Sequence, residues 1–559
     1  MYFSHISIGG GIVGVETVIS IFDNICSSLK KKNTQQNFKG KKFSFAIVDT
    51  KPENIPGGVA YGFQASQYGY FNNPLRLSPD HLKRWISLKN NKKKIVLYIK
   101  KYGGLTGKIW LRENLHILNS SKKQKFMELY FPRVLANFWM EEKLLLLLKK
   151  MKKFSKEFST LFKIKFIKGN VISIRKKTGK YAEVSFKDNK YEVLELEINK
   201  NHSKKINFKN IGNFKIGSIY SITQCVSLGL PPPKELATER SRDHANYIRD
   251  FYYSGATANL INKVISIKKK HGKKKIIIYF IGYKAGLLEP LSELKNIIQK
   301  YKISIEIICS SPDLLGIQKA QGSSNKKVYK LSILNINQLI RIKTAKKLFS
   351  SILEEFEIAK KKGYKKYDAW TEILNNEILN KCIKNFNYTE KNLYKNIIFH
   401  KIRAITRFTY PTTIEARDEL ISSGILKAKK ETVKKVDTFK NKLFVSVNDF
   451  YKVQKKYFCD LVVNVSGPLS ALKLKNEWPV IDSIKKNNGK IIEGDELTAG
   501  GFSVNDNFEL INNKNLYLPG YLANGFNPAR KTIIKAILEN SHKTGQSIAK
   551  TLYNIYNQL

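Results

Sequence analysis

A glycine-rich turn near the start of the chain has the residue types and spacing that bind the phosphates of a dinucleotide. The apolar run 2–8 leads into Gly9-Gly10-Gly11-Ile12-Val13-Gly14, which fits the pattern G-x-G-x-x-G. Glycine at the first position permits a tight turn, at the third it lets a pyrophosphate approach the backbone, and at the last it lets the helix pack closely on the strand. The N-terminus of that helix would then face the phosphates.

The residues after the turn predict the elements that position it. Apolar residues recur at helical spacing from Val15 to Leu29, and a second apolar strand, 43–48, ends at Asp49. An acid at the tip of the second strand accepts hydrogen bonds from the ribose hydroxyls of a bound nucleotide. The interval between the glycines and Asp49 exceeds the usual twenty or so residues, which we attribute to the polar insert 30–41. Strand, turn, helix, strand and acid together predict a Rossmann-type unit.

Composition limits the other classes of function. The chain has 559 residues, a size that favours two or three domains, and a net charge of +54. The charge comes mainly from lysine runs scattered between elements, as an AT-rich coding sequence produces, so we expect a solvated surface and no nucleic-acid partner. A basic nucleic-acid binder remains an alternative that the charge alone supports.

Cysteine and histidine usage argues against disulfide and metal chemistry. The five cysteines include no C-x-x-C pair, and the eight histidines form no H-x-x-x-H or H-E-x-x-H pattern, so neither a dithiol centre nor a metal site is expected. No apolar run approaches the roughly 20 residues that span a bilayer. We therefore expect a cytoplasmic protein without a membrane partner.

Three segments after the first unit carry a resemblance to a known family. The turn 56–62 reads PGGVAYG and the loop 71–78 reads FNNPLRLS, and YFPR follows at 130–133. They resemble the G-x-A-Y turn, the L-N-x-P-x-x-x-M-S loop and the F-x-P-R segment of FAD/NAD(P)-binding flavoprotein monooxygenases with two dinucleotide-binding domains. Later segments match in the same order: FIKGNVISI, CVSLGLPPP, DLVVNVSGP and LYLPGYLANGF.

The resemblance implies an FAD site assembled from the first eighty residues and the last hundred. The implied cofactor-binding residues are Gly9, Gly10, Gly11, Ile12, Val13, Gly14, Asp49, Tyr61, Asn73, Arg76, Val171, Gly229, Gly467, Gly520 and Asn524. One departure is Gly520-Tyr521, where many related flavoproteins have Gly-Asp. The aspartate that would bind the ribityl chain or the pyrophosphate is therefore absent.

A second glycine turn, Gly282-Tyr283-Lys284-Ala285-Gly286, follows the apolar strand 276–281. Lysine replaces its central glycine, which blocks the closest approach of backbone to phosphate. Two interpretations stay open: Lys284 binds a phosphate of NAD(P)H as a point charge, or the turn only shapes the fold.

The predicted fold class is α/β, with a Rossmann-like FAD-binding domain, an inserted second Rossmann-like nucleotide domain and a helical insertion. The expected bounds are 1–235 for the N-terminal part of the FAD-binding domain, 236–330 for the second dinucleotide segment, 331–451 for the helical insertion and 452–559 for the C-terminal return. Aromatic residues of the insertion could line a substrate pocket, but at helical spacing they more often form a core.

No nucleophile elbow or Walker loop is visible, so no catalytic residue is assigned and the chemistry is expected from the flavin. The resemblance implies a monooxygenase that uses NAD(P)H and molecular oxygen on a small molecule of secondary metabolism. The similarity to N-hydroxylating enzymes is distant, and that to FAD-dependent monooxygenases of tetrahydroisoquinoline antibiotic biosynthesis, of the saframycin and ecteinascidin type, is closer. The alternatives are an FAD-linked dehydrogenase or amine oxidase, and a non-catalytic flavoprotein redox sensor.

Overall fold

The computed structural model describes most of the chain. The residues outside the described part are 31–39, 62–68, 72–73, 121–122, 178, 199–205, 211–213, 229–231, 252–254, 273–274, 284, 313, 315–317, 320–327, 377, 407, 450, 468–477, 487–488, 493–500, 521, 524–532 and 558–559.

The first unit is built on a parallel sheet whose strands come from both ends of the chain. Its parallel strands lie in the order β22, β9, β1, β2, β3. Their bounds are β1 (Tyr2–Ile8), β2 (Lys42–Asp49), β3 (Leu161–Lys168), β9 (Ile219–Val226) and β22 (Leu516–Tyr517). Antiparallel strands extend both sides: β4 (Val171–Lys176) and β5 (Ala182–Phe186) next to β9, and β6 (Lys190–Ile198), β7 (Ile206–Asn210) and β8 (Lys215–Ile216) next to β3.

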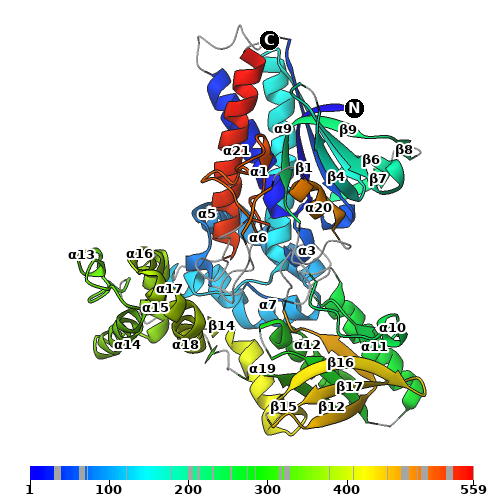
Figure 1. Cartoon of the computed structure of the whole chain (residues 1–559), viewed down its shortest axis with the longest axis vertical. Coiled ribbons are helices and arrows are strands. Elements are labelled where there is room, and N and C mark those ends of the chain that lie inside the picture. The colour runs from blue at the N-terminus through cyan, green and yellow to red at the C-terminus, as the bar shows by residue number, and fades with distance from the viewer. Residues whose placement is uncertain are drawn as a thin grey trace.

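Three long helices cover one face of this sheet. They are α1 (Ile12–Leu29), α9 (Val134–Glu157) and α21 (Ile533–Asn557), and they run side by side along the long axis (Figure 1). Their apolar faces form one core with the inner face of the sheet, as the amphipathic pattern predicts. On the other face lie α20 (Pro479–Lys486), β20 (Ile491–Ile492) and β21 (Gly501–Phe502).

Within the described residues, α1 is the helix that is long and apolar enough to cross a membrane. Most of that helix is buried inside the fold, where it packs against α21. The helix whose length and hydropathy would suit a membrane span is therefore a buried core helix of the fold.

Shorter helices connect the first unit to the rest of the chain. They are η2 (Pro52–Asn54), α3 (Gly58–Tyr61), η3 (Leu75–Leu77), α5 (Asp80–Ser87), α6 (Lys89–Tyr102), α7 (Gly104–Asn119) and α8 (Lys123–Met127).

The second unit has three layers. A parallel sheet runs in the order β10 (Tyr247–Ile248), β19 (Leu461–Asn464), β11 (Ile276–Ile281), β12 (Ile305–Ser311) and β15 (Leu426–Lys430). Helices α11 (Ala256–His271), α12 (Ala285–Tyr301) and α19 (Pro411–Ser422) cover one face. The antiparallel strands β16 (Thr432–Phe439), β17 (Lys442–Asn448) and β18 (Gln454–Cys459) cover the other, and α10 (Glu239–Arg242) lies beside β16.

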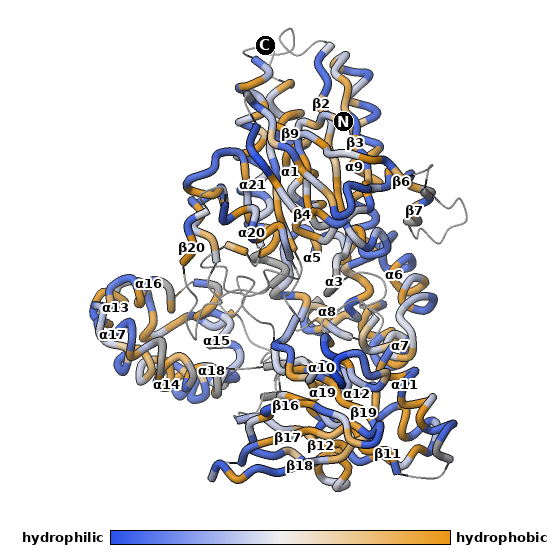
Figure 2. Tube along the Cα trace, turned by 45° about the vertical axis from the view of Figure 1, so that its right-hand side comes forward, coloured by the Kyte–Doolittle hydropathy of each residue, from blue (hydrophilic) through white to orange (hydrophobic). Residues whose placement is uncertain are grey.

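A separate group of helices branches from the second unit (Figures 1 and 2). It contains α13 (Ile336–Leu339), α14 (Ala345–Lys361), α15 (Lys366–Asn375), α16 (Ile378–Lys384), α17 (Tyr388–Leu393), the π-helical turn Tyr394–Ile398 and α18 (Phe399–Thr406). The short strands β13 (Gln318–Lys319) and β14 (Phe408–Thr409) pair at its base. Its buried aromatics, Trp370 and Phe386 among them, form the core of this helical unit rather than an open wall.

The α/β class with Rossmann-like parallel sheets is confirmed. However, residues from both sides of the bound expected at 451/452 belong to the second sheet or pack on it. Residues 426–464 pair with or pack on the second sheet, although 426–451 were assigned to the helical insertion and 452–464 to the return of the first unit. The reason is that β15 and β19 align with β12 and β11, partners more than a hundred residues away that local sequence does not reveal. We propose that the helical insertion ends near residue 409 and that the first unit resumes after the second sheet.

Candidate functional site

The first glycine turn lies where the carboxyl ends of three parallel strands meet. Gly9 has φ +102°, and a Cβ atom there would overlap the carbonyl oxygen of Ser227, directly after β9. A Cβ atom on Gly14 would overlap the carbonyl oxygen of Gly9, so the start of α1 packs against its own turn. On the far side of Ser227, a Cβ atom on Gly520, after β22, would lie 3.4 Å from the Ser227 hydroxyl oxygen. Gly9 and Gly14 require glycine because backbone fills the space, whereas the distance at Gly520 is an ordinary van der Waals contact.

A second turn packs over the middle of the motif. A Cβ atom on Gly10 would overlap the side chain of Ile55, and one on Gly11 would lie 3.2 Å from the Cα atom of Gly58. Gly58 itself has φ +71° and begins α3, so glycine faces glycine across this contact. The PGG sequence at 56–58 therefore allows the two turns to approach each other.

Asp49 joins the tip of β2 to the first turn. Its carboxylate accepts hydrogen bonds from the backbone N–H of Gly10 at 2.7 Å and of Lys51 at 2.8 Å. Burial raises the pKa of this carboxyl, and the two backbone donors oppose that shift. An ionised carboxylate has about four acceptor positions, so Asp49 retains capacity for a ribose hydroxyl.

Val171 comes to the same edge of the sheet. The N–H of Gly169 donates to the Asp49 carbonyl at 3.1 Å, and β4 begins two residues later at Val171, which is buried. The predicted residues Gly9, Gly10, Gly11, Ile12, Val13, Gly14, Asp49, Val171 and Gly520 are thus brought together at one edge. Asn73, Gly229 and Asn524 lie outside the described residues, as does Tyr521.

This edge fits the pyrophosphate end of FAD on its own geometry. Side chains are excluded from the turn by neighbouring backbone, and the N-terminal N–H groups of α1, which lack partners within a helix, open onto it.

Two other residues that the resemblance implied have different neighbours. Burial raises the pKa of Tyr61, at the end of α3, while the charge of Arg133 opposes that shift and the charge of Glu289 adds to it. The guanidinium of Arg76 pairs with Glu128 at 2.8 Å and lies 3.6 Å from a carboxylate oxygen of Asp368. Their roles toward a cofactor stay predictions.

The second glycine turn is organised in the same way at the edge of the second sheet. Gly282 has φ +111°, and a Cβ atom there would lie 2.8 Å from the Cα atom of Ser466. Gly467 follows with φ +105°, and a Cβ atom on it would meet none of the described residues within 4 Å. Gly467 therefore lies beside Gly282 at the carboxyl edge of the second sheet, and its role toward FAD stays a prediction. Gly286 is the second residue of α12, and Lys284 lies outside the described residues.

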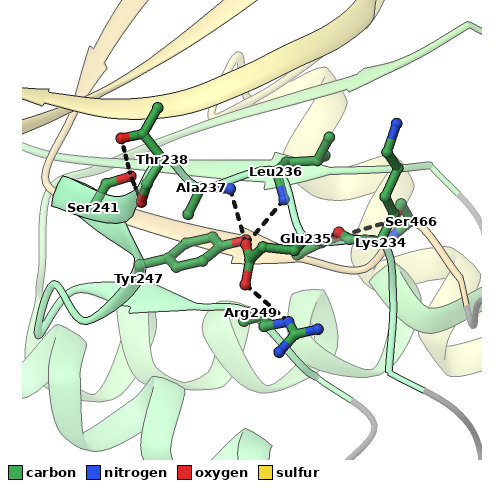
Figure 3. Close-up of polar contacts among 10 residues, drawn as sticks. Lys234, Glu235, Leu236, Ala237, Thr238, Ser241, Tyr247, Arg249 and Ser466 are labelled. Atoms are coloured by element: carbon green, nitrogen blue, oxygen red, sulfur yellow. Dashed lines mark hydrogen bonds and ion pairs between the residues drawn. The ribbon is translucent and has the colours of Figure 1, made fainter. Parts of the chain in front are cut away.

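Buried polar groups hold the Ser466 turn in place (Figure 3). The Asn464 side-chain amide donates to the Lys234 carbonyl at 3.0 Å, and its oxygen accepts from the Ser466 N–H at 3.1 Å and hydroxyl at 2.7 Å. Because Asn464 is fully buried and ends β19, this network ties the turn to the segment that enters the unit.

Glu235 organises the adjoining segment. One carboxylate oxygen accepts from the N–H groups of Leu236 and Ala237 and from the Tyr247 hydroxyl, each at 2.9 Å, and the other pairs with Arg249 Nε at 2.9 Å (Figure 3). Burial and the neighbouring carboxylate raise the pKa of Tyr247. Arg249 is thereby fixed directly after β10, which pairs with β19.

Neither metal chemistry nor thiol chemistry finds support in the part of the chain that the structure describes. No group of three or more metal-ligating side chains occurs among those residues. All five cysteines are free and buried, and burial raises the pKa of Cys225 and Cys309 to about 12. Such thiols are not reactive nucleophiles near neutral pH.

Sequence reasoning missed Ile55 and Ser227, which pack against the first glycine turn, and Glu289, which pairs with Arg133 of the YFPR segment. The Gly57-Gly58 pair was a usable signal for a close backbone contact. Ser227 and Glu289 carry no local signal, because their importance comes from partners more than 150 residues away.

Similarity to known proteins is confined to solved structures. No known family model matches the chain, and no curated protein matches it. An L-lysine 6-monooxygenase from Pseudomonas syringae is similar at 10% identity and a TM-score of 0.46, over 98% of this chain and 99% of that one. A cadaverine monooxygenase from Erwinia amylovora, solved with FAD, gives 9% and 0.45 over 97% and 94%. The reduced ornithine hydroxylase of Pseudomonas aeruginosa gives 10% and 0.43 over 99% of both chains.

Proposed function

We propose that this chain is an FAD-dependent oxidoreductase that takes electrons from NAD(P)H. The observation that carries the proposal is the hydrogen bond from the Gly10 N–H to Asp49, in a turn whose glycines are required by Ser227, Gly9 and Gly58. A turn, a helix N-terminus and an acid at the tip of the next strand form the arrangement that holds the pyrophosphate and ribose of a dinucleotide. The strand β22, which precedes Gly520, brings the C-terminal region back to the first sheet beside β9.

The residues of the first site have separable tasks in this proposal. The N–H groups at the start of α1 hold the pyrophosphate, and Asp49 orients the ribose while keeping the turn closed. FAD, when bound, supplies the redox chemistry that no protein side chain of this set can perform. The chain itself contributes orientation and exclusion of water.

The second glycine turn is the proposed NAD(P)H site. The support is the position of Gly282 and Gly467 at the carboxyl ends of adjacent strands, where parallel α/β sheets bind ligands, and the open space at Gly467. The substrate in this proposal is a small molecule of secondary metabolism, hydroxylated with molecular oxygen in the cytoplasm. A tetrahydroisoquinoline intermediate is the finer proposal, and it rests only on the sequence resemblance to monooxygenases of saframycin- and ecteinascidin-type biosynthesis.

The test is an absorbance spectrum of the purified protein with added FAD, followed by anaerobic titration with NADH and with NADPH. We expect bound flavin whose oxidised band bleaches with one of the two nucleotides. Bound flavin that neither nucleotide reduces would favour an FAD-linked dehydrogenase or a redox sensor. No flavin binding would refute the proposal.

A further inference from the structure

Two backbone segments of the first unit pair with each other between the other two units. We call residues 69–77 and 128–133 the strap, of which 72–73 lie outside the described residues. Backbone hydrogen bonds join the two segments: Phe71 N to Phe131 O at 2.9 Å, Leu75 N to Leu129 O at 2.9 Å, and Arg133 N to Gly69 O at 2.7 Å. The strap carries one arginine near each end.

Arg133 binds the second unit. Its Nη1 lies 3.1 Å from a carboxylate oxygen of Glu289 on α12, and its Nη2 donates to the Tyr70 carbonyl at 3.3 Å. Both side chains are about four-fifths buried, so the pair is screened much less than a surface ion pair. A Cβ atom on Gly69 would overlap the Glu289 carboxylate, which explains glycine at this end of the strap.

A second carboxylate on the same face of α12 strengthens this contact. Glu293, one turn after Glu289, accepts a hydrogen bond from the Thr106 hydroxyl on α7 and is buried. The helix that begins at the second glycine turn is therefore held against the first unit by two side chains a turn apart.

Arg76 binds the helical unit at the other end. Besides Glu128 within the first unit, it contacts Asp368 on α15, and its guanidinium lies 5.2 Å from the centre of the Tyr367 ring. Asp368 and Tyr367 are buried, so this contact lies inside the junction and not on its rim.

An aromatic cluster fills the space between the two ends. The ring of Tyr410, directly before α19, lies 4.2 Å from the Tyr70 ring and 5.1 Å from the Tyr130 ring, centre to centre. Tyr410 connects the helical unit to α19, which packs on α12. All three units thus meet at the strap.

We propose that the strap is a two-ended positioning element, in which Arg133 fixes the second glycine turn through α12 and Arg76 fixes the helical unit through α15. Neither arginine is given a catalytic role. The consequence for electron transfer rests on the proposed function: Arg133 sets the distance between the two nucleotide sites, to which transfer rates are sensitive.

The two ends can be tested separately with variants that keep side-chain size. Glu289→Gln leaves Arg133 without its counter-charge. Asp368→Asn removes the charge that α15 presents to Arg76, which keeps its ion pair with Glu128, and the side-chain oxygen still accepts from the Lys365 N–H. Hydrogen exchange followed by mass spectrometry on the full chain is the readout. We expect Glu289→Gln to speed exchange in 285–301 by about tenfold and to leave 366–375 unchanged, and Asp368→Asn to do the reverse.

Lys295→Gln is the matched control. Lys295 also lies on α12, but it pairs with Glu419 inside the second unit. It should leave the exchange of 69–77 unchanged, whereas Glu289→Gln should raise it. The two-ended strap would be overturned if Glu289→Gln and Lys295→Gln changed the exchange of 69–77 equally. It would also be overturned if a single variant raised the exchange of both 285–301 and 366–375.

A kinetic readout separates this proposal from the proposed function. We expect anaerobic flavin reduction by NAD(P)H to slow at least about tenfold in Glu289→Gln, with reduction by dithionite unchanged. If the unmodified protein is not reduced by NAD(P)H, the proposed function fails while the exchange experiment still decides the strap. If reduction is unaffected by Glu289→Gln although 285–301 loosens, the positioning claim is refuted.

Discussion

Asp49 closes the first glycine turn through a charge-assisted hydrogen bond from the Gly10 N–H. Hydrogen bonds to charged groups contribute about 1.5–3 kcal/mol, more than neutral ones. Asp49→Asn keeps the size of the side chain but removes the charge and an acceptor for the ribose. We therefore expect FAD to bind at least about tenfold more weakly, measured by titration of flavin fluorescence.

Asp23→Asn is the control for this substitution. Asp23 lies on α1 and pairs with Lys150, far along the helix from the turn. It should change the FAD dissociation constant by less than about twofold, because partly exposed ion pairs contribute little. Equal losses in the two variants would mean that Asp49 has no specific role.

A substitution at Gly11 tests whether a ligand occupies the space beside the first glycine turn. Its φ of −73° suits any residue, so Gly11→Ala strains no backbone dihedral, and its Cβ atom would lie 3.2 Å from Gly58 Cα. We expect a stability loss of about 1 kcal/mol from this contact. We also expect at least about a tenfold loss of FAD affinity, because the methyl group occupies the phosphate approach. Unchanged affinity in a folded variant would contradict the site.

At the scale of elements, the docking of α12 on α7 has a consequence for pH. Burial raises the pKa of Glu293 from 4.5 to about 7, the Thr106 hydrogen bond opposes the shift, and the charge of Glu289 adds to it. A carboxyl whose pKa is higher in the folded state stabilises the fold fully below pH 4.5, and this contribution is lost as pH rises through 7. The loss is limited to about 3 kcal/mol.

Glu293→Gln removes this titration and still accepts the Thr106 hydrogen bond. The melting temperature of the variant minus that of the unmodified protein should be larger at pH 8.5 than at pH 5.5. Differential scanning calorimetry at both pH values measures the difference. The same offset at both values would show that Glu293 does not titrate in this range.

Elements that follow a local pattern were predictable. The segment from β1 to Asp49 was predictable, because strand, glycine turn, helix and acid lie within fifty residues and the strands and the helix each show their own periodicity. The sheet to which Gly467 belongs could not be predicted, because strand order depends on pairing between distant segments. The same reason hid the ion pair of Arg133 with Glu289, whose partners are separated by 156 residues. Local pattern thus indicated the nucleotide turns but not the contacts between units.

At the scale of the whole molecule, the first unit is closed by the last helix of the chain. The Tyr556 hydroxyl bonds to the Ser4 hydroxyl at 2.9 Å and to the Lys42 carbonyl at 3.1 Å, so the end of α21 lies beside β1 and β2 (Figure 1). Further along, the Ser541 hydroxyl donates to the Val13 carbonyl within the glycine motif at 3.3 Å. The C-terminal helix therefore contacts the glycine motif directly.

Gly545 is the position at which this packing can be disturbed from the far end. A Cβ atom there would overlap the side chain of Ser20 on α1, so Gly545→Val must push the two helices apart. Overpacking of this kind costs about 1–3 kcal/mol, and we expect the melting temperature to fall by about 2–8 °C. Because Val13 loses part of its support, FAD should also bind more weakly. Gln546→Val, at the exposed neighbouring position of α21, should change neither quantity. A Gly545→Val protein that melts at a lower temperature but binds FAD normally would show that the turn holds its shape without the C-terminal helix.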